Sequence, residues 1–388
     1  MRILFSSTRG PGHVQPLLPY ALELQSRGHD VRVAAPLEVA AALSETGLVH
    51  TPFGHPGDDV LTPIWARFRG RPSREVMAIA MSEIFAGANA RAAMPGLQAT
   101  AQSFRPELIV RDSSEFAGLV AARALGISHA RVAVHSVSFE EQLPPLVGDA
   151  LDALRERAGL PPDAGAALLA EPVFSSFPAA LDVVPEGSRQ RPPFRARARD
   201  LPVSAAPAAW APADGAEPLV YITFGTMIGG IPEVRAIYAR ALEAVATLPV
   251  RALLTTGRGF DSSALGSIPS NVTVEEWVPQ AEVLPRAHAL VCHGGSGTVL
   301  GGLAAGLPLV VAGFGADQPH NARLVTAASA GIALDNPDVT TLRAAIQRAL
   351  DDVALRAGAR KLASEMAAMP TIADAADQLT LLARQTSS

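Results

Sequence analysis

The chain repeats one order of elements in its two halves: an apolar strand, a turn that contains glycines, and then a helix. In the first half the mostly apolar residues 2–7 lead into Gly10 and Gly12, and in the second half residues 289–292 lead into the segment 293–297. Apolar strands that alternate with amphipathic helices are typical of a parallel, doubly wound sheet. Because 388 residues are long for one core, we expect two such α/β domains, with ligands at the switch point of each sheet.

The composition changes over residues 187–218, which are rich in proline, alanine and arginine and show no sustained period. Such a segment is typical of a linker between domains. We therefore assign a first domain to residues 1–200, a linker to 201–217 and a second domain to 218–370. Two helices separated by Pro370 are predicted for the end of the chain.

Hydrophobic periodicity and turn residues indicate where the strands and helices lie. Strands are predicted over residues 2–7, 29–35, 48–53, 107–111, 128–134, 174–177, 181–184, 219–224, 250–255, 272–275, 289–292 and 309–312. Helices are predicted over 13–27, 37–46, 114–125, 232–248, 281–286, 299–305, 319–330 and 340–351. Residues 54–72 are predicted to be an irregular loop, and the helical segment 74–104 to be interrupted near Pro95 and Gly96.

Charge and cysteine content exclude several classes of protein. The formal net charge is -5 and no basic run is dense enough to neutralise a phosphate backbone, so nucleic acid is not an expected partner. The single cysteine excludes an intrachain disulfide. No apolar stretch reaches the roughly 20 residues of a membrane span, and the apolar N-terminal run is too short for a signal-peptide core. We expect a cytoplasmic protein that is a monomer or a homodimer.

The turn His293-Gly294-Gly295-Ser296-Gly297-Thr298 has the features of an anion site. It connects a buried strand to a helix, so free backbone N–H groups and the positive end of the helix dipole meet there. Phosphates are the natural ligands of such a site, and the imidazole of His293 adds a further donor. We interpret this turn as the binding site for the diphosphate of a nucleotide-sugar.

Four stretches together carry a resemblance to a known family. They are Arg9-Gly-Pro-Gly-His13-Val-Gln-Pro16, Tyr221-Ile-Thr-Phe-Gly225-Thr226, Glu276-Trp277-Val278-Pro279-Gln280, and residues 293–298 with Asp317-Gln318-Pro-His-Asn321. The chain resembles a family 1 glycosyltransferase of the UDP-glycosyltransferase superfamily, in its bacterial natural-product and antibiotic branch. The resemblance implies the GT-B fold, with an N-terminal acceptor-binding domain and a C-terminal donor-binding domain that face a cleft. It also implies that the C-terminal helix, residues 371–388, packs back on the first domain.

The resemblance makes His13 the candidate general base and Asp112 its acidic partner. His13 opens a helix after the glycine turn, and an imidazole is suited to proton abstraction at neutral pH. Asp112 follows a neighbouring strand, where its carboxylate would fix the tautomer of the imidazole. The plain alternatives are that His13 only contacts solvent and that Asp112 caps the helix after it.

The resemblance distributes the donor contacts over both glycine turns and two further segments. It assigns the diphosphate to His293, Gly295, Ser296, Gly297 and Thr298, faced by Gly12, Gly225 and Thr226; the nucleobase to Trp277, Val278 and Gln280; and the sugar hydroxyls to Asp317 and Gln318. The alternatives are a buried structural His293, a core Trp277 and an ordinary loop at 317–318. Cys292 is interpreted as a small core residue and not as a nucleophile.

Metal-dependent sugar transferases use an Asp-x-Asp motif, which this sequence lacks, so no metal and no other cofactor is expected beside the nucleotide-sugar co-substrate. Family members with ribonucleotide donors often carry a glutamate for the ribose hydroxyls eight residues after the motif histidine. This chain has Gly301 at that position. Because deoxyribose has no 2′-hydroxyl to bind, a dTDP-linked deoxysugar is favoured over a UDP-linked donor.

A group of aromatic and methionine side chains in the first domain suits a large hydrophobic acceptor, either planar or macrocyclic. The candidates are Phe53, Trp65, Phe68, Met77, Met81 and Phe85. The alternative is that these side chains simply belong to the core.

These observations together predict an inverting, metal-independent hexosyltransferase that acts on a hydrophobic natural product, such as an aromatic polyketide or a macrolide. Whether the new bond is to oxygen or to carbon stays open. The alternatives are a nucleotide-sugar epimerase or hydrolase on the same fold and a non-catalytic auxiliary partner of another transferase. A Rossmann oxidoreductase is excluded, because Gln15 stands at its third glycine position and the second strand ends in Ala34-Ala35-Pro36, with no acidic residue.

Overall fold

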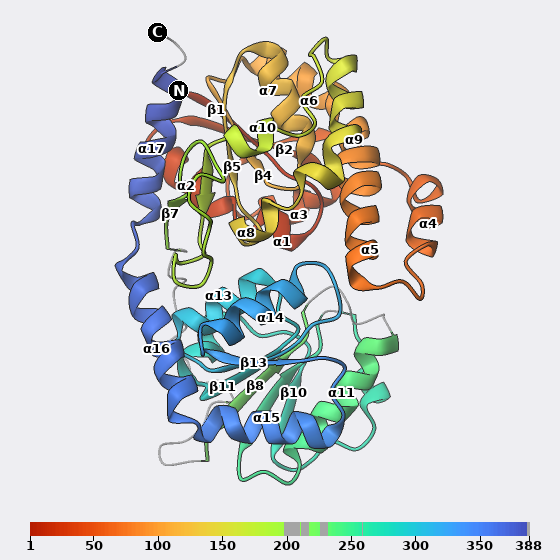
Figure 1. The fold of residues 1–388 in the computed structure, drawn as a ribbon, viewed down its shortest axis with the longest axis vertical. Coiled ribbons are helices and arrows are strands. Elements are labelled where there is room, and N and C mark those ends of the chain that lie inside the picture. The colour runs from red at the N-terminus through yellow and green to blue at the C-terminus, as the bar shows by residue number, and fades with distance from the viewer. Residues whose placement is uncertain (198–209, 211–216, 226–231, 258, 386–388) are drawn as a thin grey trace. The chain divides into compact units, whose positions relative to one another are not determined.

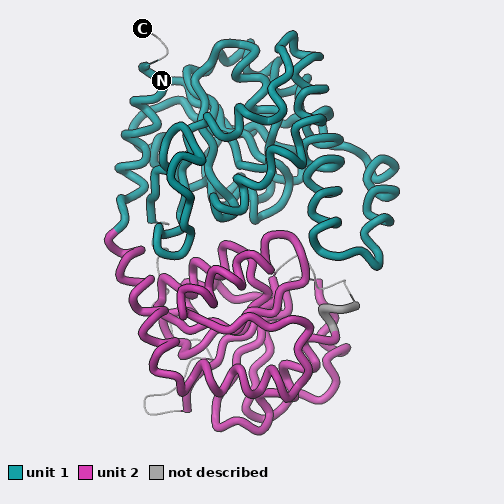
Figure 2. The backbone as a smooth tube through the Cα atoms, viewed as in Figure 1, with its two compact units in different colours: residues 1–199, 369–388 teal, residues 200–368 magenta. Residues whose placement is uncertain are grey.

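The computed structural model of the chain describes residues 1–197, 210, 217–225, 232–257 and 259–385. The chain divides into two compact units, which Figure 2 shows in different colours. Unit 1 consists of residues 1–199 and 369–388, and unit 2 consists of residues 200–368. The chain therefore leaves unit 1 for unit 2 and returns to unit 1 at its C-terminal end.

Unit 1 is built on a parallel sheet of seven strands in the order β3-β2-β1-β4-β5-β6-β7 (Figure 1). The order reverses between β1 and β4, which pair from Ile3 with Leu108 to Ser6 with Arg111. The carboxyl ends of these two strands are thus the switch point, where open α/β sheets bind their ligands. The strands are β1 Arg2–Ser6, β2 Asp30–Pro36, β3 Val49–Phe53, β4 Leu108–Asp112, β5 Ser128–Val132, β6 Val173–Ser175 and β7 Phe194–Arg195.

Helices cover both faces of this sheet. The helices that the structure describes in unit 1 are α1 Pro11–Val14, α2 Leu18–Ser26, α3 Ala40–Leu43, α4 Asp58–Ala66, α5 Ser73–Ile79, α6 Ala90–Phe104, α7 Phe116–Leu125, α8 Val137–Glu140, α9 Pro144–Arg157, α10 Ala167–Ala170 and α17 Ile372–Gln385. A short 3-10 helix η1 Leu37–Val39 precedes α3, and a π-helix η2 Ala80–Asn89 joins α5 to α6. Among the helices that the structure describes, none has the length and apolar composition of a membrane span.

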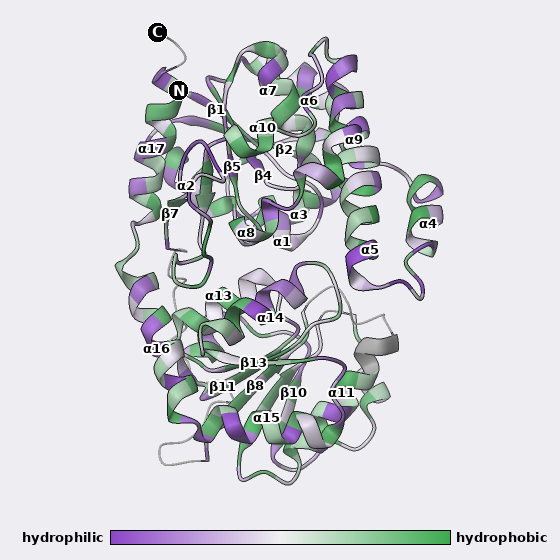
Figure 3. Ribbon diagram, viewed as in Figure 1, coloured by the Kyte–Doolittle hydropathy of each residue, from purple (hydrophilic) through white to green (hydrophobic). Residues whose placement is uncertain are grey.

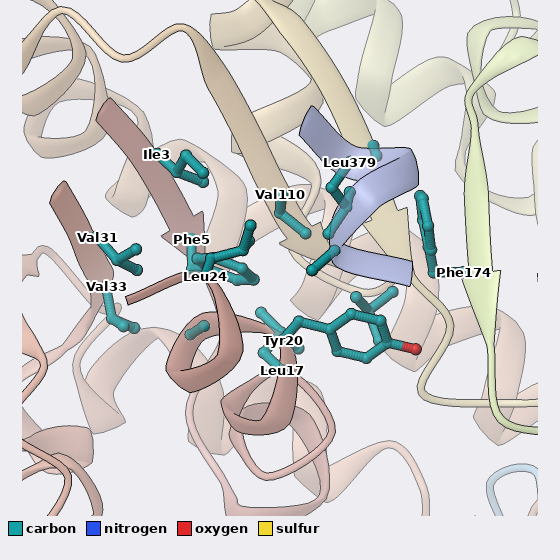
Figure 4. Packing of buried hydrophobic residues seen from close by; sticks show 14 of the residues in the cluster. Ile3, Phe5, Leu17, Tyr20, Leu24, Val31, Val33, Val110, Phe174 and Leu379 are labelled. Atoms are coloured by element: carbon teal, nitrogen blue, oxygen red, sulfur yellow. The ribbon is translucent and has the colours of Figure 1, made fainter. Parts of the chain in front are cut away.

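Two buried clusters lie on opposite faces of the unit 1 sheet. Ile3 and Phe5 belong to the cluster that also contains residues of α2 and α17, whereas Leu4 belongs to the cluster with α6, α7 and α9. This division follows from the alternation of side chains along a strand. Figure 4 shows Tyr20 of α2 and Leu379 of α17 in the first cluster. The helix at the C-terminal end of the chain is therefore part of the core of unit 1.

Unit 2 is a second parallel sheet, of six strands in the order β10-β9-β8-β11-β12-β13. Its switch point lies between β8 and β11, which pair from Ala289 with Val220 to Cys292 with Thr223. Figure 3 shows the central strands as largely hydrophobic, as expected for strands that helices cover on both faces. The strands are β8 Leu219–Thr223, β9 Arg251–Thr255, β10 Val272–Glu275, β11 Ala289–Cys292, β12 Leu309–Ala312 and β13 Gly331–Leu334.

The helices of unit 2 are α11 Pro232–Val245, α12 Gln280–Val283, α13 Ser296–Ala304, α14 Gln318–Ala327, α15 Val339–Asp351 and α16 Val353–Ala368, with 3-10 helices η3 Ser262–Leu265 and η4 Leu284–Arg286. The prediction of two Rossmann-like α/β domains is confirmed, and strands β10, β11 and β12 have the predicted bounds. The predicted linker, residues 201–217, lies outside the described residues except for its positions 210 and 217.

The prediction that residues 54–72 form an irregular loop is wrong, because this segment contains helix α4. Its prolines and glycines suggested a loop, and Pro63 does lie inside the helix. Asp58 and Asp59 in the first turn favour the helix through its dipole. Leu61 anchors it in a small buried cluster with residues of η2. Tertiary packing here outweighs the weak local propensity.

The predicted interruption at Pro95 and Gly96 is also wrong, because α6 continues through both residues. Gly96 serves close packing instead of ending a helix. A Cβ atom at this position would lie 2.8 Å from the Cβ of Phe53, so only glycine lets the end of β3 approach α6 this closely.

Residues 181–184 do not form the predicted strand. Asp182 instead accepts hydrogen bonds from the backbone N–H groups of Val137 (2.8 Å) and Ser138 (3.0 Å), and so holds the start of α8. Two real strands were not predicted. β7 has two residues within a proline-rich segment, and β13 follows α14 without a clear turn signal.

Replacing Leu379 with alanine is expected to destabilise unit 1. Leu379 is 0% exposed in the cluster that joins α17 to α2, so its truncation leaves a cavity, at a cost of about 2–5 kcal/mol. Leu381 of the same helix is 47% exposed, and Leu381→Ala is the matched control with little expected effect. The measurement is the urea midpoint of unfolding; equal midpoints for the two variants would contradict the docking of α17 in this core.

Candidate active site

Asp112 ends strand β4 with a fully buried carboxylate. Its Oδ1 accepts hydrogen bonds from Nδ1 of His13 (3.3 Å) and from the backbone N–H of Ser114 (2.7 Å). Its Oδ2 accepts from the backbone N–H of Thr8 (2.7 Å) and from the hydroxyl of Ser7 (3.0 Å). Burial alone would raise the pKa of Asp112, but His13 and the backbone donors hold it below its ordinary value, so the carboxylate is ionised at neutral pH.

His13 lies in the single turn α1, after the glycine turn that follows β1, and Gly12 beside it is exposed. Because an ionised carboxylate only accepts hydrogen bonds, the contact with Asp112 places a proton on Nδ1 and leaves the lone pair on Nε2. The side chain is 18% exposed, and its ring lies beside those of Phe85 (centroids 5.5 Å apart) and His135 (6.4 Å). The structure thus brings together the two residues predicted as catalytic and adds His135, which no sequence motif indicated.

Glu115, and not Asp112, caps helix α7. Its Oε1 accepts a hydrogen bond from the N–H of Ala117 (2.8 Å), and its Oε2 accepts from the N–H of Gly118 (2.8 Å). The hydroxyl of Ser6 donates to the same Oε2 (2.6 Å), while burial raises the pKa of Glu115 to about 7. The cap role that the sequence left open for Asp112 is therefore taken by another residue.

The chain after Asp112 is folded around the guanidinium of Arg111. Nη1 of Arg111 donates hydrogen bonds to the backbone carbonyls of Asp112 (3.1 Å), Ser113 (3.0 Å) and Glu115 (3.1 Å). Nε and Nη2 donate to the two carboxylate oxygens of Glu171, at 3.0 and 2.5 Å. Both side chains are fully buried. This bidentate pair therefore fixes the backbone from which the Asp112 carboxylate extends.

Two of the six acceptor candidates, Phe53 and Phe85, line a small cavity at the switch point of unit 1. Phe85 also contacts the ring of His13, so the cavity lies beside the candidate base. Both phenylalanines are partly buried and pack at the edge of the cluster that contains α6 and α7.

The other four acceptor candidates lie elsewhere. Met77 is partly buried, and Met81 is 2% exposed within the cluster of α6 and α7, so Met81 is a core residue. Trp65 and Phe68 contact each other at the end of α4, with ring centroids 4.9 Å apart, and Trp65 is 44% exposed. None of these four residues lines the cavity that Phe53 and Phe85 line.

The glycine turn of unit 2 leads from β11 into α13, which begins at Ser296, three residues before the predicted start. Gly295 is the N-cap residue and supplies no side-chain hydrogen bond to the helix. Within the part of the chain that the structure describes, no side chain caps the first N–H groups of α13, which are left to a ligand or to water. The turn predicted for an anion has the local structure that anion binding requires.

His293 lies between the two glycine turns of unit 2. A Cβ atom would lie 3.1 Å from its Nε2 at Gly225 and 2.5 Å at Gly295, and Gly225 has a φ of +97°. Both positions therefore need glycine. Burial lowers the pKa of His293 to about 4, against the opposing effects of Asp317 and the Thr223 carbonyl, so the imidazole is neutral at pH 7. Among the described residues, none forms a hydrogen bond with its buried Nδ1.

Asp317 holds the same turn from the side of α14. Its Oδ2 accepts hydrogen bonds from the hydroxyl of Ser296 (2.6 Å) and the amide of Asn321 (2.7 Å). The amide of Asn321 also donates to the carbonyl of Gly294 (2.9 Å). Gln318 uses its Oε1 to accept from two backbone N–H groups of its own loop. Asn321 is 0% exposed and is a positioning residue whose role the sequence motif did not reveal.

The nucleobase candidates lie after β10. Trp277 is 47% exposed, so it is not a core residue, whereas Val278 is 8% exposed. The amide of Gln280 donates a hydrogen bond to the hydroxyl of Thr298 (3.3 Å) and so connects α12 to the start of α13. Thr226, also predicted for the donor, lies outside the described residues.

Comparisons with known proteins cover nearly the whole chain. Two family models, described as the N-terminal and C-terminal domains of erythromycin biosynthesis protein CIII-like, match residues 22–190 and 239–382. The chain is 30% identical to elloramycin glycosyltransferase of Streptomyces olivaceus, over 98% of this chain and 97% of that protein. It is 29% identical to tylactone mycaminosyltransferase of Streptomyces fradiae, over 98% and 92%. The crystal structure of the glycosyltransferase SnogD from Streptomyces nogalater superposes with a TM-score of 0.77, at 28% identity over 99% of both chains.

The contact between His293 and the glycine turns predicts different effects for two neighbouring substitutions. Gly295→Ala places a Cβ 2.5 Å from Nε2 of His293, so the ring must leave its place, and we expect unit 2 to lose about 1–3 kcal/mol. Gly297→Ala is the matched control, because its Cβ meets no atom within 4 Å. Thermal unfolding of both variants checks this; a Gly295→Ala protein as stable as the control would contradict the packing described.

Proposed function

Since the chain belongs to the family 1 glycosyltransferases of bacterial natural-product biosynthesis, we propose that it moves a deoxysugar from dTDP to a hydrophobic acceptor, with inversion at C1 and without a metal. The chain is a glycosyltransferase, and its relatives are sugar transferases for polyketide and macrolide products. The acceptor we propose is accordingly an aromatic polyketide or a macrolide. His13 is the proposed base and Asp112 its partner.

The hydrogen bond between His13 and Asp112 carries this proposal. With the proton of Nδ1 held by the carboxylate, the lone pair of Nε2 takes the proton of the acceptor hydroxyl. The acceptor oxygen forms a bond to C1 of the sugar as the bond from C1 to the diphosphate breaks, and the diphosphate leaves with the electron pair. A single displacement of this kind inverts C1. The ionised Asp112 stabilises the imidazolium that forms.

In unit 2, the proposed diphosphate site is the start of α13. Its uncapped N–H groups stabilise the negative charge that grows on the leaving group, which is the contribution that a metal makes in other transferases. The neutral His293 adds a donor without adding charge. Ser296 and Asn321 bond to Oδ2 of Asp317, so Oδ1 is the oxygen we assign to a sugar hydroxyl.

The proposed preference for dTDP rests on Gly301. A Cβ atom here would lie 3.0 Å from Cδ1 of Leu284 and 3.8 Å from Oε1 of Gln280. An apolar methyl group therefore occupies the space beside the position at which related ribonucleotide-dependent enzymes carry a ribose-binding carboxylate. Such surroundings suit a deoxyribose better than a ribose with a 2′-hydroxyl.

Replacement of His13 by alanine is expected to lower kcat by roughly 10²–10⁴-fold, because the acceptor loses its base. The dissociation constant for dTDP, measured by calorimetry, should stay within about twofold of the wild-type value, since the donor residues are unchanged. Steady-state turnover with a dTDP-sugar and an aromatic acceptor gives the rate. Unchanged turnover would remove His13 from the mechanism, and sugar release at the same rate without acceptor would indicate a hydrolase.

The donor preference is tested by calorimetric titration with dTDP and with UDP. The wild-type protein is expected to bind dTDP more tightly, and Gly301→Glu should shift the preference towards UDP by supplying a carboxylate for the 2′-hydroxyl. Because Leu284 must move to admit the new side chain, the thermal midpoint of the variant is recorded as a control. Tighter binding of UDP by the wild-type protein would refute the dTDP assignment.

A further inference from the structure

The small cavity beside the catalytic pair has a mixed lining that the proposed mechanism does not use. Phe53, Phe85 and Phe116 form its aromatic walls. Its free volume is about 10 Å³, which is room for one water molecule or one polar group of that size. The cavity lies wholly within unit 1, among the segments that follow the first strands and the start of α7.

Four polar atoms of the lining are buried without a hydrogen-bond partner among the described residues. They are Oγ1 of Thr8, Nε2 of His55, Oδ1 of Asn89 and Oγ of Ser114. Thr8, Asn89 and Ser114 are 4%, 8% and 0% exposed. A buried polar group without a hydrogen bond destabilises the fold, and several in one cavity of this size indicate a site built for a polar ligand group.

The same residues connect the cavity to the catalytic pair. The backbone N–H groups of Thr8 and Ser114 both donate to the carboxylate of Asp112, at 2.7 Å each. Both residues also line the cavity, and their side-chain oxygens are among the unpartnered atoms. Phe85 contacts the ring of His13 and lines the cavity as well. The ring of Phe85 is therefore a common neighbour of the cavity and of the candidate base.

We propose that this cavity binds a hydroxyl substituent of the acceptor, other than the hydroxyl that receives the sugar. The inference rests on the proposed function, because it takes the ligand to be the acceptor. Oδ1 of Asn89 can accept a hydrogen bond, and the hydroxyls of Thr8 and Ser114 can donate one. A ligand hydroxyl satisfies both kinds of partner at once, whereas a carbonyl has no proton for Asn89 and a methyl group satisfies neither.

Phe85 borders both the cavity and the ring of His13, so it favours a flat aromatic body that lies outside the cavity and places one hydroxyl in it. The class of acceptor that fits is thus a polyhydroxylated aromatic, with one hydroxyl at the base and another in the cavity. Sites that hydrogen-bond a substrate hydroxyl discriminate strongly against the analogue that lacks it, because their buried polar groups are then left unpaired. Thr8, Asn89 and Ser114 are accordingly the residues expected to set acceptor specificity.

The test is a binding experiment without donor, so it does not depend on turnover or on the nucleotide. Two probes are titrated by fluorescence quenching: a dihydroxyanthraquinone with both hydroxyls on one edge, and the monohydroxyanthraquinone that lacks one of them. The wild-type protein is expected to bind the dihydroxy probe about tenfold more tightly or better. Thr8→Val, which is nearly isosteric, and Asn89→Leu should bring the two affinities within about twofold.

Ser82→Ala is the matched control, from the same π-helix η2 as Asn89. The hydroxyl of Ser82 donates a hydrogen bond to the carbonyl of Ala78, and Ser82 does not line the cavity. This variant should keep the full preference. Thermal midpoints separate binding from folding: Thr8→Val should melt no lower than the wild-type protein, since its hydroxyl has no partner to lose. The proposal is overturned if the wild-type protein binds the two probes equally tightly, or if it binds neither of them. If both variants keep the preference, the proposal is overturned as well; lower thermal midpoints would then show that these polar atoms hold a structural water only.

Discussion

The buried ion pair between Arg111 and Glu171 is the contact on which the site of unit 1 depends. Arg111 belongs to β4, and the pair extends through Arg131 of β5, which lies 3.7 Å from Glu171 and 3.1 Å from Glu140. Removing one partner of such a pair leaves an uncompensated buried charge, typically at a cost of about 3–5 kcal/mol. Because the same guanidinium binds three carbonyls just beyond β4, this network also determines where the Asp112 carboxylate points.

In unit 2 the position of the candidate histidine, His293, is fixed by close packing. Its site contains no buried ion pair of this type among the described residues, and His293 is held instead by the absence of side chains at Gly225 and Gly295. Asn321 then ties the turn to α14. The two units therefore place their candidate histidines, His13 and His293, at the switch points of similar sheets. His13 is positioned by charge and hydrogen bonding, and His293 by close packing. The ionisation of His293 is suppressed by that packing.

Periodicity was enough to predict the two sheets, because strands buried on both faces are nearly continuous apolar runs, such as 289–292. The pairing of His13 with Asp112 was expected from the family resemblance, and the fold explains it, since both residues lie at the ends of strands that meet at the switch point. Periodicity failed where a tertiary contact overrides local preference, as at Gly96 in α6 and at Pro63 in α4. Hydrophobic periodicity also does not predict which polar residue caps a helix, as Glu115 caps α7, because neighbouring polar residues compete for the same N–H groups.

The division of unit 1 between residues 1–199 and 369–388 has a consequence for synthesis and for engineering. During translation α17 is synthesised only after unit 2. Until α17 emerges, the apolar face of the N-terminal unit that it covers stays exposed. For the same reason, a chimera that joins this N-terminal unit to the donor unit of a relative needs two junctions. A single crossover in the linker would leave a foreign helix on its core.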